Sequence, residues 1–233
     1  MNQNRLTVTN ALIIINVVVF VVGLLAQAPA IYSIRTPNGI PTPTLEILGS
    51  YSWYTCFMEG QLWRLISYQF LHGSFGHVLF NMWALYFFGP AVEHILGGKK
   101  FLAFYLICGV AGALFSSLIG GLGFFGEMQQ VLVPTASGDV EAVYLWQLIP
   151  LVGASAAIYG VMTATAILYP DVYISLIFPP VTLKLRSFAI IVILIASLSI
   201  VFNWTNAGGE AGHLGGIIMG AALIYAFKKC LGW

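Results

Sequence analysis

Residues 148–169 read LIPLVGASAAIYGVMTATAILY, and this stretch decides the fold. It contains no Asp, Glu, Lys or Arg. A helix needs about 20 predominantly apolar residues to cross the hydrocarbon core of a bilayer. The stretch therefore predicts a membrane-spanning helix, with Ser155 as one of its few polar residues.

The composition of the rest of the chain agrees with this prediction. Of 233 residues, 59% are hydrophobic and 7% are charged, and the mean hydropathy is +0.91. A soluble domain is nearer one quarter charged, so a cytosolic enzyme and a disordered chain are excluded. The net charge of +1 offers no basic face to a nucleic acid. What remains is an integral membrane protein, and the apolar runs are long enough for helices rather than barrel strands.

Five further apolar segments accompany the first. We therefore expect an all-α, polytopic membrane protein with six transmembrane helices in a single domain over residues 1–233. The six predicted spans are about 10–28, 77–97, 101–123, 148–169, 187–203 and 211–227. The first span also resembles a signal peptide, because the sequence Ala26-Gln27-Ala28 after an apolar run is typical of a cleavage site. Cleavage there would leave five spans, and we prefer six.

The positive charges predict the orientation of the bundle. With six spans and the N-terminus inside, seven basic residues lie on the inner side and two, Arg35 and Arg64, on the outer side, which accounts for all nine. The inner seven are Arg5, Lys99, Lys100, Lys184, Arg186, Lys228 and Lys229. This asymmetry follows the positive-inside rule. It predicts cytoplasmic N- and C-termini, and the lack of an Arg/Ser-rich transit peptide favours a bacterial plasma membrane.

The connection at about 29–76 is long and aromatic. Aromatic side chains with few charges suit the headgroup region of a bilayer, so we expect this first outer loop to be partly embedded. Its aromatic residues are Tyr51, Trp53, Tyr54, Phe57, Trp63, Tyr68 and Phe70.

Polar residues inside spans are costly, and each is therefore a candidate for function. His77 and Asn81 lie one turn apart at the start of the second span, Ser155 lies early in the fourth, and His213 lies early in the sixth. All three spans enter from the outer face. These residues therefore share one depth, about 10 Å below the outer boundary of the membrane. Tyr159 follows Ser155 by one turn.

A serine and a histidine at one depth predict nucleophilic catalysis. Ser155 would be the nucleophile and His213 the base that takes its proton. His77, Asn81 and the Ser155 backbone amide would stabilise an oxyanion. No Asp or Glu is expected near this depth, so the pattern predicts a Ser/His dyad without an acidic third member.

Glycines predict how the fourth and sixth spans, which carry Ser155 and His213, meet. Gly208, Gly212, Gly216 and Gly220 recur every four residues and form a smooth stripe that lets another helix approach closely. Such a stripe can serve packing alone, and a lone serine in a membrane helix usually bonds to its own backbone. Here the close approach would bring His213 to Ser155.

A metal site and a disulfide framework are the less favoured interpretations. His72, His77 and His213 lack a nearby thiolate or carboxylate ligand, so we expect no metal, and no motif indicates a cofactor. Three cysteines without a C-x-x-C pair predict unpaired structural thiols, at Cys56, Cys108 and Cys230.

The same residues resemble the motifs of the rhomboid intramembrane serine proteases over about 60–227. The resemblance rests on three segments in order. They are Trp63-Arg64 with His72 and His77-Val78-Leu79-Phe80-Asn81, then Gly153-Ala154-Ser155-Ala156 with Tyr159, and finally Gly212-His213-Leu214-Gly215-Gly216 with Gly220.

The resemblance implies a six-helix rhomboid-like bundle with Ser155 as nucleophile and His213 as base. It also implies that Trp63 and Arg64 organise the first loop, and that Gly153 and Tyr159 line the site. Substrates would be membrane proteins cut in or near a transmembrane helix in the lipid bilayer. The loop at about 124–147 is longer than the resemblance predicts, and we expect it to shield the site, gate it or select substrates.

Two other functions stay open from the sequence. One is a rhomboid-like protein that binds membrane helices without cutting them. The other is a small transporter, which an internal repeat or broken helices would favour; the sequence contains neither. The sequence leaves open the oligomeric state, the substrate and the biological pathway.

Overall fold

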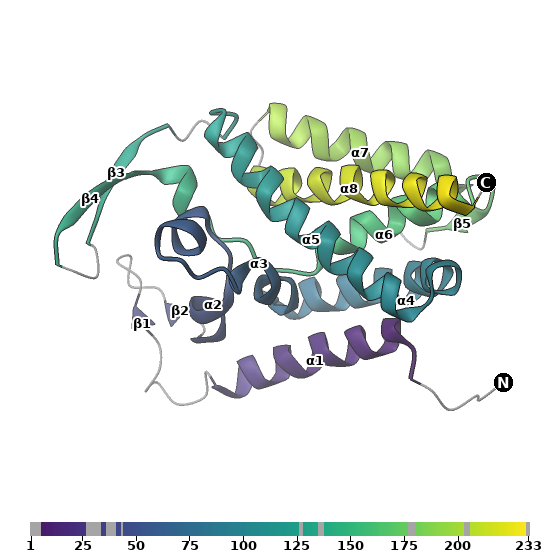
Figure 1. Ribbon diagram of the computed structural model, residues 1–233, viewed down its shortest axis with the longest axis horizontal. Helices are drawn as coiled ribbons and strands as arrows, with labels where there is room; N and C mark the ends of the chain where they lie inside the picture. Colours follow the sequence, from purple (N-terminus) through teal and green to yellow (C-terminus); the bar gives the residue numbers. More distant parts are fainter. Residues whose placement is uncertain are drawn as a thin grey trace.

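The computed structural model describes residues 6–26, 34–35, 41–42, 44–125, 128–134, 138–176, 180–202 and 206–231. Within these ranges the chain is mostly helical (Figure 1). The six longest described helices are α1 (Val8–Ala26), α4 (Phe75–Leu96), α5 (Gly98–Gly121), α6 (Ser155–Leu168), α7 (Leu185–Val201) and α8 (Ala207–Leu231). Arg5 and residues 27 and 28 of the predicted first span lie outside the described residues.

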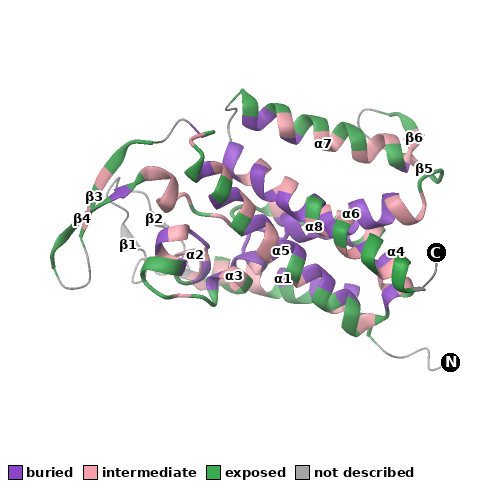
Figure 2. Cartoon of the chain, turned by 45° about the horizontal axis from the view of Figure 1, so that its top comes forward, coloured by how far each residue is buried: buried purple, intermediate pink, exposed green. Residues whose placement is uncertain are grey.

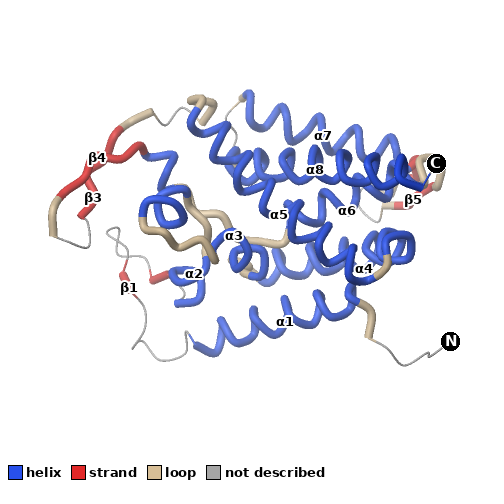
Figure 3. The backbone as a smooth tube through the Cα atoms, viewed as in Figure 1, coloured by secondary structure: helices blue, strands red, loops and turns tan. Residues whose placement is uncertain are grey.

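Short elements fill the connections. Helical turns between α1 and α4 are α2 (Thr44–Gly49), η1 (Tyr54–Met58), α3 (Arg64–Ser67) and η2 (Tyr68–Phe70), and η3 (Leu145–Leu148) precedes α6. Three antiparallel pairs join β1 (Ile34–Arg35) to β2 (Pro41–Thr42), β3 (Gln130–Pro134) to β4 (Val140–Tyr144), and β5 (Tyr173–Ser175) to β6 (Thr182–Lys184). Strands therefore occur only in connections among the described residues, and Figure 3 shows them at the ends of the helices.

The described helices confirm the predicted all-α membrane bundle. By length and hydropathy, α1, α5 and the Ala207–Cys230 part of α8 can each cross a membrane, and α6 and α7 are shorter apolar helices. Many of the large apolar residues of α1 and α7 are exposed, and Figure 2 shows both helices coloured mostly as exposed and intermediate. Lipid is the solvent that makes such surfaces stable.

The bounds of all six predicted spans differ from those of the helices, and two of them differ by four residues or more at one end or both. The span predicted at 148–169 becomes helical only at Ser155, because an isolated bridge pairs Leu151 with Tyr51 and Gly153 has a positive φ. The span predicted at 211–227 begins at Ala207 and continues to Leu231. The second correction matters most, since it moves Glu210 from a loop into the first turn of a helix.

The core lies where α8 packs between α5 and α6. Buried side chains of α4, α5 and α6, among them Leu85, Phe101 and Ile158, form one cluster with Ile224 of α8. At one end of the bundle, Glu93 of α4 accepts hydrogen bonds from the backbone amides of Val8 and Thr9 at 2.7 and 2.8 Å. That carboxylate satisfies free N–H groups at the start of α1 and joins α1 to α4.

Candidate active site

Ser155 is the first residue of α6, and a glycine turn leads the chain into it. Gly153 has a φ of 122°, a region that residues with a side chain rarely adopt. The Gly153 N–H donates to the carbonyl oxygen of Tyr68 at 2.9 Å, which ties the turn to η2. The Ser155 side chain is half-buried at this helix start.

His213 of α8 contacts the serine directly. The distance between His213 Nε2 and Ser155 Oγ is 2.8 Å, although the residues are 58 positions apart. Tyr159, one turn after Ser155, stacks on the imidazole with ring centroids 4.1 Å apart and planes 7° from parallel. The stacking fixes the orientation of the imidazole ring, and the hydrogen bond joins α6 to α8.

Glycines of α8 make this contact possible, but not equally. A methyl group built on Gly216 would overlap the carbonyl oxygen of Ala156, and one built on Gly220 would meet the α6 backbone at 2.5 Å. A methyl group on Gly212 would lie 3.7 Å from its nearest atom, the carbonyl oxygen of Gly112, which is an ordinary contact. The approach of α8 to α6 therefore depends on Gly216 and Gly220 rather than on Gly212.

The His77 and Asn81 side chains differ in how they lie toward the serine. Ser74 caps α4 by accepting from the His77 N–H at 3.1 Å. A methyl group on Gly153 would be 2.7 Å from His77 Nε2 and 3.7 Å from Ser155 Oγ, so the His77 ring lies beside the serine. Asn81 is buried, and its Nδ2 donates to the His77 carbonyl oxygen at 2.9 Å. An amide nitrogen has two protons, so one remains for another acceptor.

The residues expected to organise the first loop lie away from this centre. Arg64 is buried and donates to the carbonyl oxygens of Ser50 and Ile47 at 2.6 and 2.8 Å. The Trp63 indole N–H donates to the Leu48 carbonyl oxygen at 3.2 Å. Burial lowers the pKa of the Arg64 guanidinium. Both residues join α3 to the end of α2, which supports a structural role.

His72 lies next to His77 but is not part of the serine contact. The two rings meet edge to face with centroids 4.9 Å apart, and the His72 side chain is buried. Burial, assisted by the neighbouring His77, lowers the pKa of His72 to about 4. The ring is therefore neutral at pH 7. In the part of the chain that the structure describes, no three His, Cys, Asp or Glu side chains gather in a way that could hold a metal ion.

Glu210 is the residue that sequence reasoning missed. Its Oε2 lies 3.0 Å from His213 Nδ1, on the imidazole edge opposite Ser155. The expectation that no carboxylate lies near the pair is therefore wrong, and the error follows from the helix start assigned at 211 instead of 207. Side chains three residues apart on one helix lie on the same face. The spacing of Glu210 and His213 therefore indicates their contact, provided that the helix is taken to begin at Ala207.

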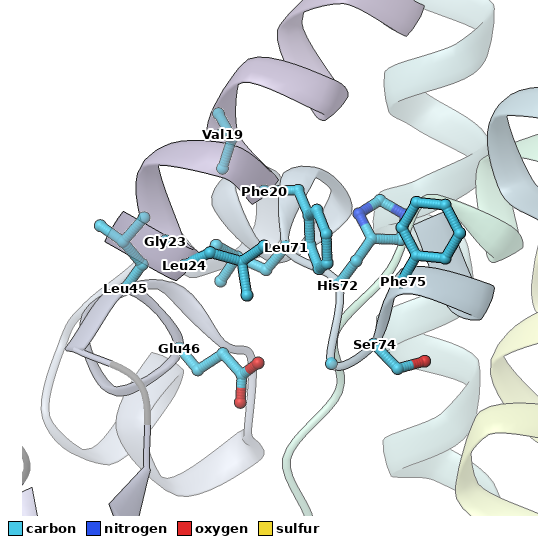
Figure 4. Close-up of a pocket in the computed structure, with 11 residues that line it drawn as sticks. Val19, Phe20, Gly23, Leu24, Leu45, Glu46, Leu71, His72, Ser74 and Phe75 are labelled. Atoms are coloured by element: carbon cyan, nitrogen blue, oxygen red, sulfur yellow. The ribbon is translucent and has the colours of Figure 1, made fainter. Parts of the chain in front are cut away.

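A separate cavity of about 250 Å³ lies between α1, α2 and the segment before α4. Figure 4 shows its wall of apolar side chains from Val19, Phe20, Leu24, Leu45 and Leu71, with the Glu46 carboxylate and the His72 ring at its margin. Neither Ser155 nor His213 lines it. The contact between Ser155 and His213 therefore lies outside this cavity.

Comparisons with known proteins agree with the geometry. A family model described as the rhomboid domain matches residues 59–230. Rhomboid protease GluP of Bacillus subtilis is 30% identical over 179 residues, which cover 77% of this chain and 28% of that protein. Rhomboid protease AarA of Providencia stuartii is 29% identical over 176 residues, which cover 75% of this chain and 59% of that protein.

A third relative is named as inactive. Inactive RHOMBOID-like protein 8 of Arabidopsis thaliana is 28% identical over 102 residues, which cover 40% of this chain and 29% of that protein. The chain thus spans only about a quarter to three fifths of the length of these relatives. The family model nevertheless covers well over half of this chain. The chain belongs to the rhomboid family.

Proposed function

We propose that the chain is an intramembrane serine endopeptidase that cleaves membrane proteins in or near a transmembrane helix. The observation that carries the proposal is the 2.8 Å contact between Ser155 Oγ and His213 Nε2. A serine with an imidazole at hydrogen-bond distance is the arrangement that activates a hydroxyl for attack. Two relatives named as rhomboid proteases support the same activity.

The first half of the reaction forms an acyl-enzyme. Nε2 of His213 takes the proton of the Ser155 hydroxyl while Oγ attacks the carbonyl carbon of the scissile peptide bond. The carbonyl π electrons move to oxygen and give a tetrahedral oxyanion. When this intermediate collapses, the C–N bond breaks and the His213 imidazolium gives its proton to the leaving amine.

The oxyanion needs donors that are already in place. The Ser155 backbone N–H stands at the first position of α6, where helix N–H groups have no partner within the helix. The His77 ring lies beside Ser155, and Asn81 retains one amide proton. Each such donor is worth about 10²- to 10³-fold in rate in a serine protease.

Hydrolysis of the acyl-enzyme completes the cycle. Water attacks the ester carbonyl, His213 takes a proton from that water, and Ser155 Oγ leaves and recovers its proton. A substrate helix must unwind locally before either step, because its carbonyl groups are hydrogen-bonded and its carbonyl carbons are shielded. Substrates with small or helix-breaking residues near the cut are therefore expected.

A cleavage assay tests the proposal. The purified protein is incubated in detergent with a panel of labelled single-span substrates, beside Ser155→Ala and His213→Ala. We expect cleavage by the parent and none by either variant. A fluorophosphonate probe should label the parent and leave Ser155→Ala unlabelled.

Ser197→Ala is a matched control for the nucleophile. Ser197 also lies in an apolar helix, but its hydroxyl donates to the Ile193 carbonyl oxygen of its own helix at 2.8 Å. This variant should cleave and label as the parent does. Equal cleavage by the parent and Ser155→Ala would disprove the mechanism.

Binding without cleavage is the second candidate function. The relative named as an inactive rhomboid-like protein shows that resemblance to the family does not by itself establish activity. If the parent cleaves no substrate of the panel and the probe fails to label Ser155, capture of intact single-span proteins by the parent becomes the function to test.

We also propose that the N- and C-termini are cytoplasmic, in a bacterial plasma membrane. Seven of the nine basic residues would then lie inside. Cys230 reports on this orientation, because it is exposed near the end of α8 whereas Cys56 and Cys108 are buried. A membrane-impermeant maleimide should label Cys230 in broken cells but not in intact cells. Labelling of intact cells would reverse the orientation.

A further inference from the structure

Glu210 stands in a position to act on His213. Its Oε2 is 3.0 Å from Nδ1, and the exposed fractions of the histidine and glutamate side chains are 13% and 21%. Glu210 lies in the first turn of α8, where the helix dipole favours a negative charge. Its backbone N–H donates to the carbonyl oxygen of Asn206 at 3.0 Å, which fixes the turn.

We propose that Glu210 is a positioning residue that completes a Ser155–His213–Glu210 triad, an inference that rests on the proposed function. The carboxylate accepts a hydrogen bond from Nδ1–H and so selects the tautomer whose Nε2 lone pair faces Ser155. When Nε2 takes the serine proton, the carboxylate stabilises the imidazolium, and it remains unprotonated itself.

The tautomer follows from the two contacts of the imidazole. A neutral imidazole has one N–H donor and one acceptor nitrogen. An ionised carboxylate can only accept, so Nδ1 must carry the proton as long as Glu210 is charged. Without Glu210, Nδ1–H has no such partner among the described side chains and the Nε2–H tautomer becomes competitive. That tautomer cannot take a proton from Ser155.

Other groups near the pair do not replace the carboxylate. The groups that face His213 from other helices are Tyr159 of α6, which stacks on its ring, and His77 of α4. Neither of these is a carboxylic acid, so neither supplies a negative charge at neutral pH. The charged residue of α7, Arg186, pairs with Asp171 after the far end of α6. Glu210 is thus the carboxylate that contacts His213 within the described residues.

The expected loss of kcat in Glu210→Gln depends on how exposed the Glu210 side chain is. Loss of the charge of a fully buried triad acid costs about 10⁴-fold in kcat. Because Glu210 is partly exposed, water screens its charge and can replace part of the hydrogen bond, so we expect about a 10- to 100-fold loss in kcat for Glu210→Gln.

The experiment compares the parent, Glu210→Gln, Glu210→Asp and Glu210→Ala with the control Glu59→Gln. Glu59 is an exposed acid in the connection between η1 and α3, and its Oε2 accepts from Gln61. Cleavage rates and fluorophosphonate labelling rates are measured from pH 5 to 9, with unfolding temperatures alongside. We expect loss of rate in Glu210→Gln, a larger loss in Glu210→Ala, partial rescue in Glu210→Asp and parent behaviour in Glu59→Gln.

A spectroscopic readout is independent of turnover. Nitrogen-15 chemical shifts of the histidine rings, with His213 assigned from His213→Ala, report which ring nitrogen carries the proton. The parent should show the Nδ1–H tautomer, and Glu210→Ala should show a mixture with Nε2–H. An unchanged tautomer in Glu210→Ala overturns the inference, whether or not the parent cleaves.

Failure of the inference and failure of the proposed function look different. If Ser155→Ala is inactive but Glu210→Gln keeps the parent rate and pH profile, Glu210 is not a positioning residue and the endopeptidase stands. If Glu210→Gln only lowers the unfolding temperature and leaves the cleavage and labelling rates of the folded protein unchanged, its role is structural and the inference is overturned. If Ser155→Ala cleaves as the parent does, the proposed function fails first.

Discussion

Two adjacent helices, α7 and α8, meet the rest of the molecule in opposite ways. In α8 small residues bring the backbone against α5 and α6, and its buried positions include Gly212, Gly216 and Gly220. In α7 only Leu185, Ala196, Ser199 and Ile200 are buried, and most large side chains face outward (Figure 2). Close backbone contacts fix α8, whereas α7 packs against the bundle only through the narrow face formed by its few buried residues.

The difference teaches what holds His213 against Ser155 inside a membrane. Lipid is as apolar as leucine, so burial of leucine against another helix gains little from the hydrophobic effect. Dispersion contacts between close backbones supply the specificity instead. His213 is held by such contacts, whereas α7 carries large apolar side chains that lipid can cover. The close contacts of α8 should therefore not tolerate added side-chain volume. The outer face of α7 should tolerate changes in side-chain volume.

The largest expected effect is that of Gly216→Ala. A methyl group there overlaps the Ala156 carbonyl oxygen, so α8 must move away from α6 and His213 must move away from Ser155. A displacement of about 1 Å at reacting groups can cost about 100-fold in rate. We expect a loss of about that size in the cleavage assay, together with a lower unfolding temperature.

Gly212→Ala is the matched control on the same helix. Its methyl group would lie 3.7 Å from the nearest atom, and alanine is the better helix former by about 1 kcal/mol. The variant should keep the parent rate and unfold at the same or a higher temperature. Equal damage from both substitutions would show that the regular four-residue spacing, rather than the individual contact, controls packing.

The next effect concerns the narrow face of α7. Ala196 is buried with an exposed fraction of 1%, so Ala196→Leu adds volume where none is available. Overpacking of this kind costs about 1–3 kcal/mol of unfolding free energy. Leu194→Ala on the outer face, where the side chain is 54% exposed, should change stability by less than about 0.5 kcal/mol. Unfolding in detergent measures both, and a larger loss in Leu194→Ala would contradict the comparison.

The sequence predicted the class of fold, the candidate residues and the approach of His213 to Ser155, whereas the distance between the two side chains comes from the structure. Apolar runs and a stripe of glycines are local patterns, and the all-α membrane bundle followed from them. The distance between Ser155 and His213 depends on how two helices cross, which spacing alone suggests but does not determine. The start of α6 was placed seven residues early because the apolar stretch continues through a segment that is not helical.

The start of α8 was also misplaced by a local sequence pattern, but here the predicted helix begins too late. Gly208-Gly209 predicts a break, because glycine pairs usually mark loops. In the structure, the Gly208 carbonyl oxygen accepts from Ser116 Oγ of α5 at 2.8 Å, and Asn206 takes the positive φ of 78° before the helix. Tertiary contacts thus keep two glycines helical. Glu210 was missed as a partner of His213 for this reason.

A smaller effect is expected where α7 touches α4. Phe188 of α7 stacks on Phe88 of α4 with ring centroids 6.3 Å apart and planes 16° from parallel. Phe188→Leu keeps an apolar side chain and removes the ring pair, which is worth about 0.5–1.5 kcal/mol. The unfolding free energy should fall by that amount while the cleavage rate stays near the parent's. A large loss of rate would mean that α7 does fix the reaction centre.

The smallest effect is expected at the connection that leads into α7. Lys184 donates to Asp171 Oδ1 at 2.9 Å, and this hydrogen bond, with the charges of Lys184 and Arg186, lowers the pKa of the Asp171 carboxyl. A lowered pKa in the folded state contributes stability above the ordinary value near 3.8, and that contribution is lost as the pH falls through the folded value. Because Asp171 is fully exposed, the gain is screened by water and salt. Asp171→Asn should therefore unfold at nearly the parent temperature at pH 7 in 0.15 M salt, whereas a clear drop that high salt removes would show that this ion pair helps to hold α7 against the bundle.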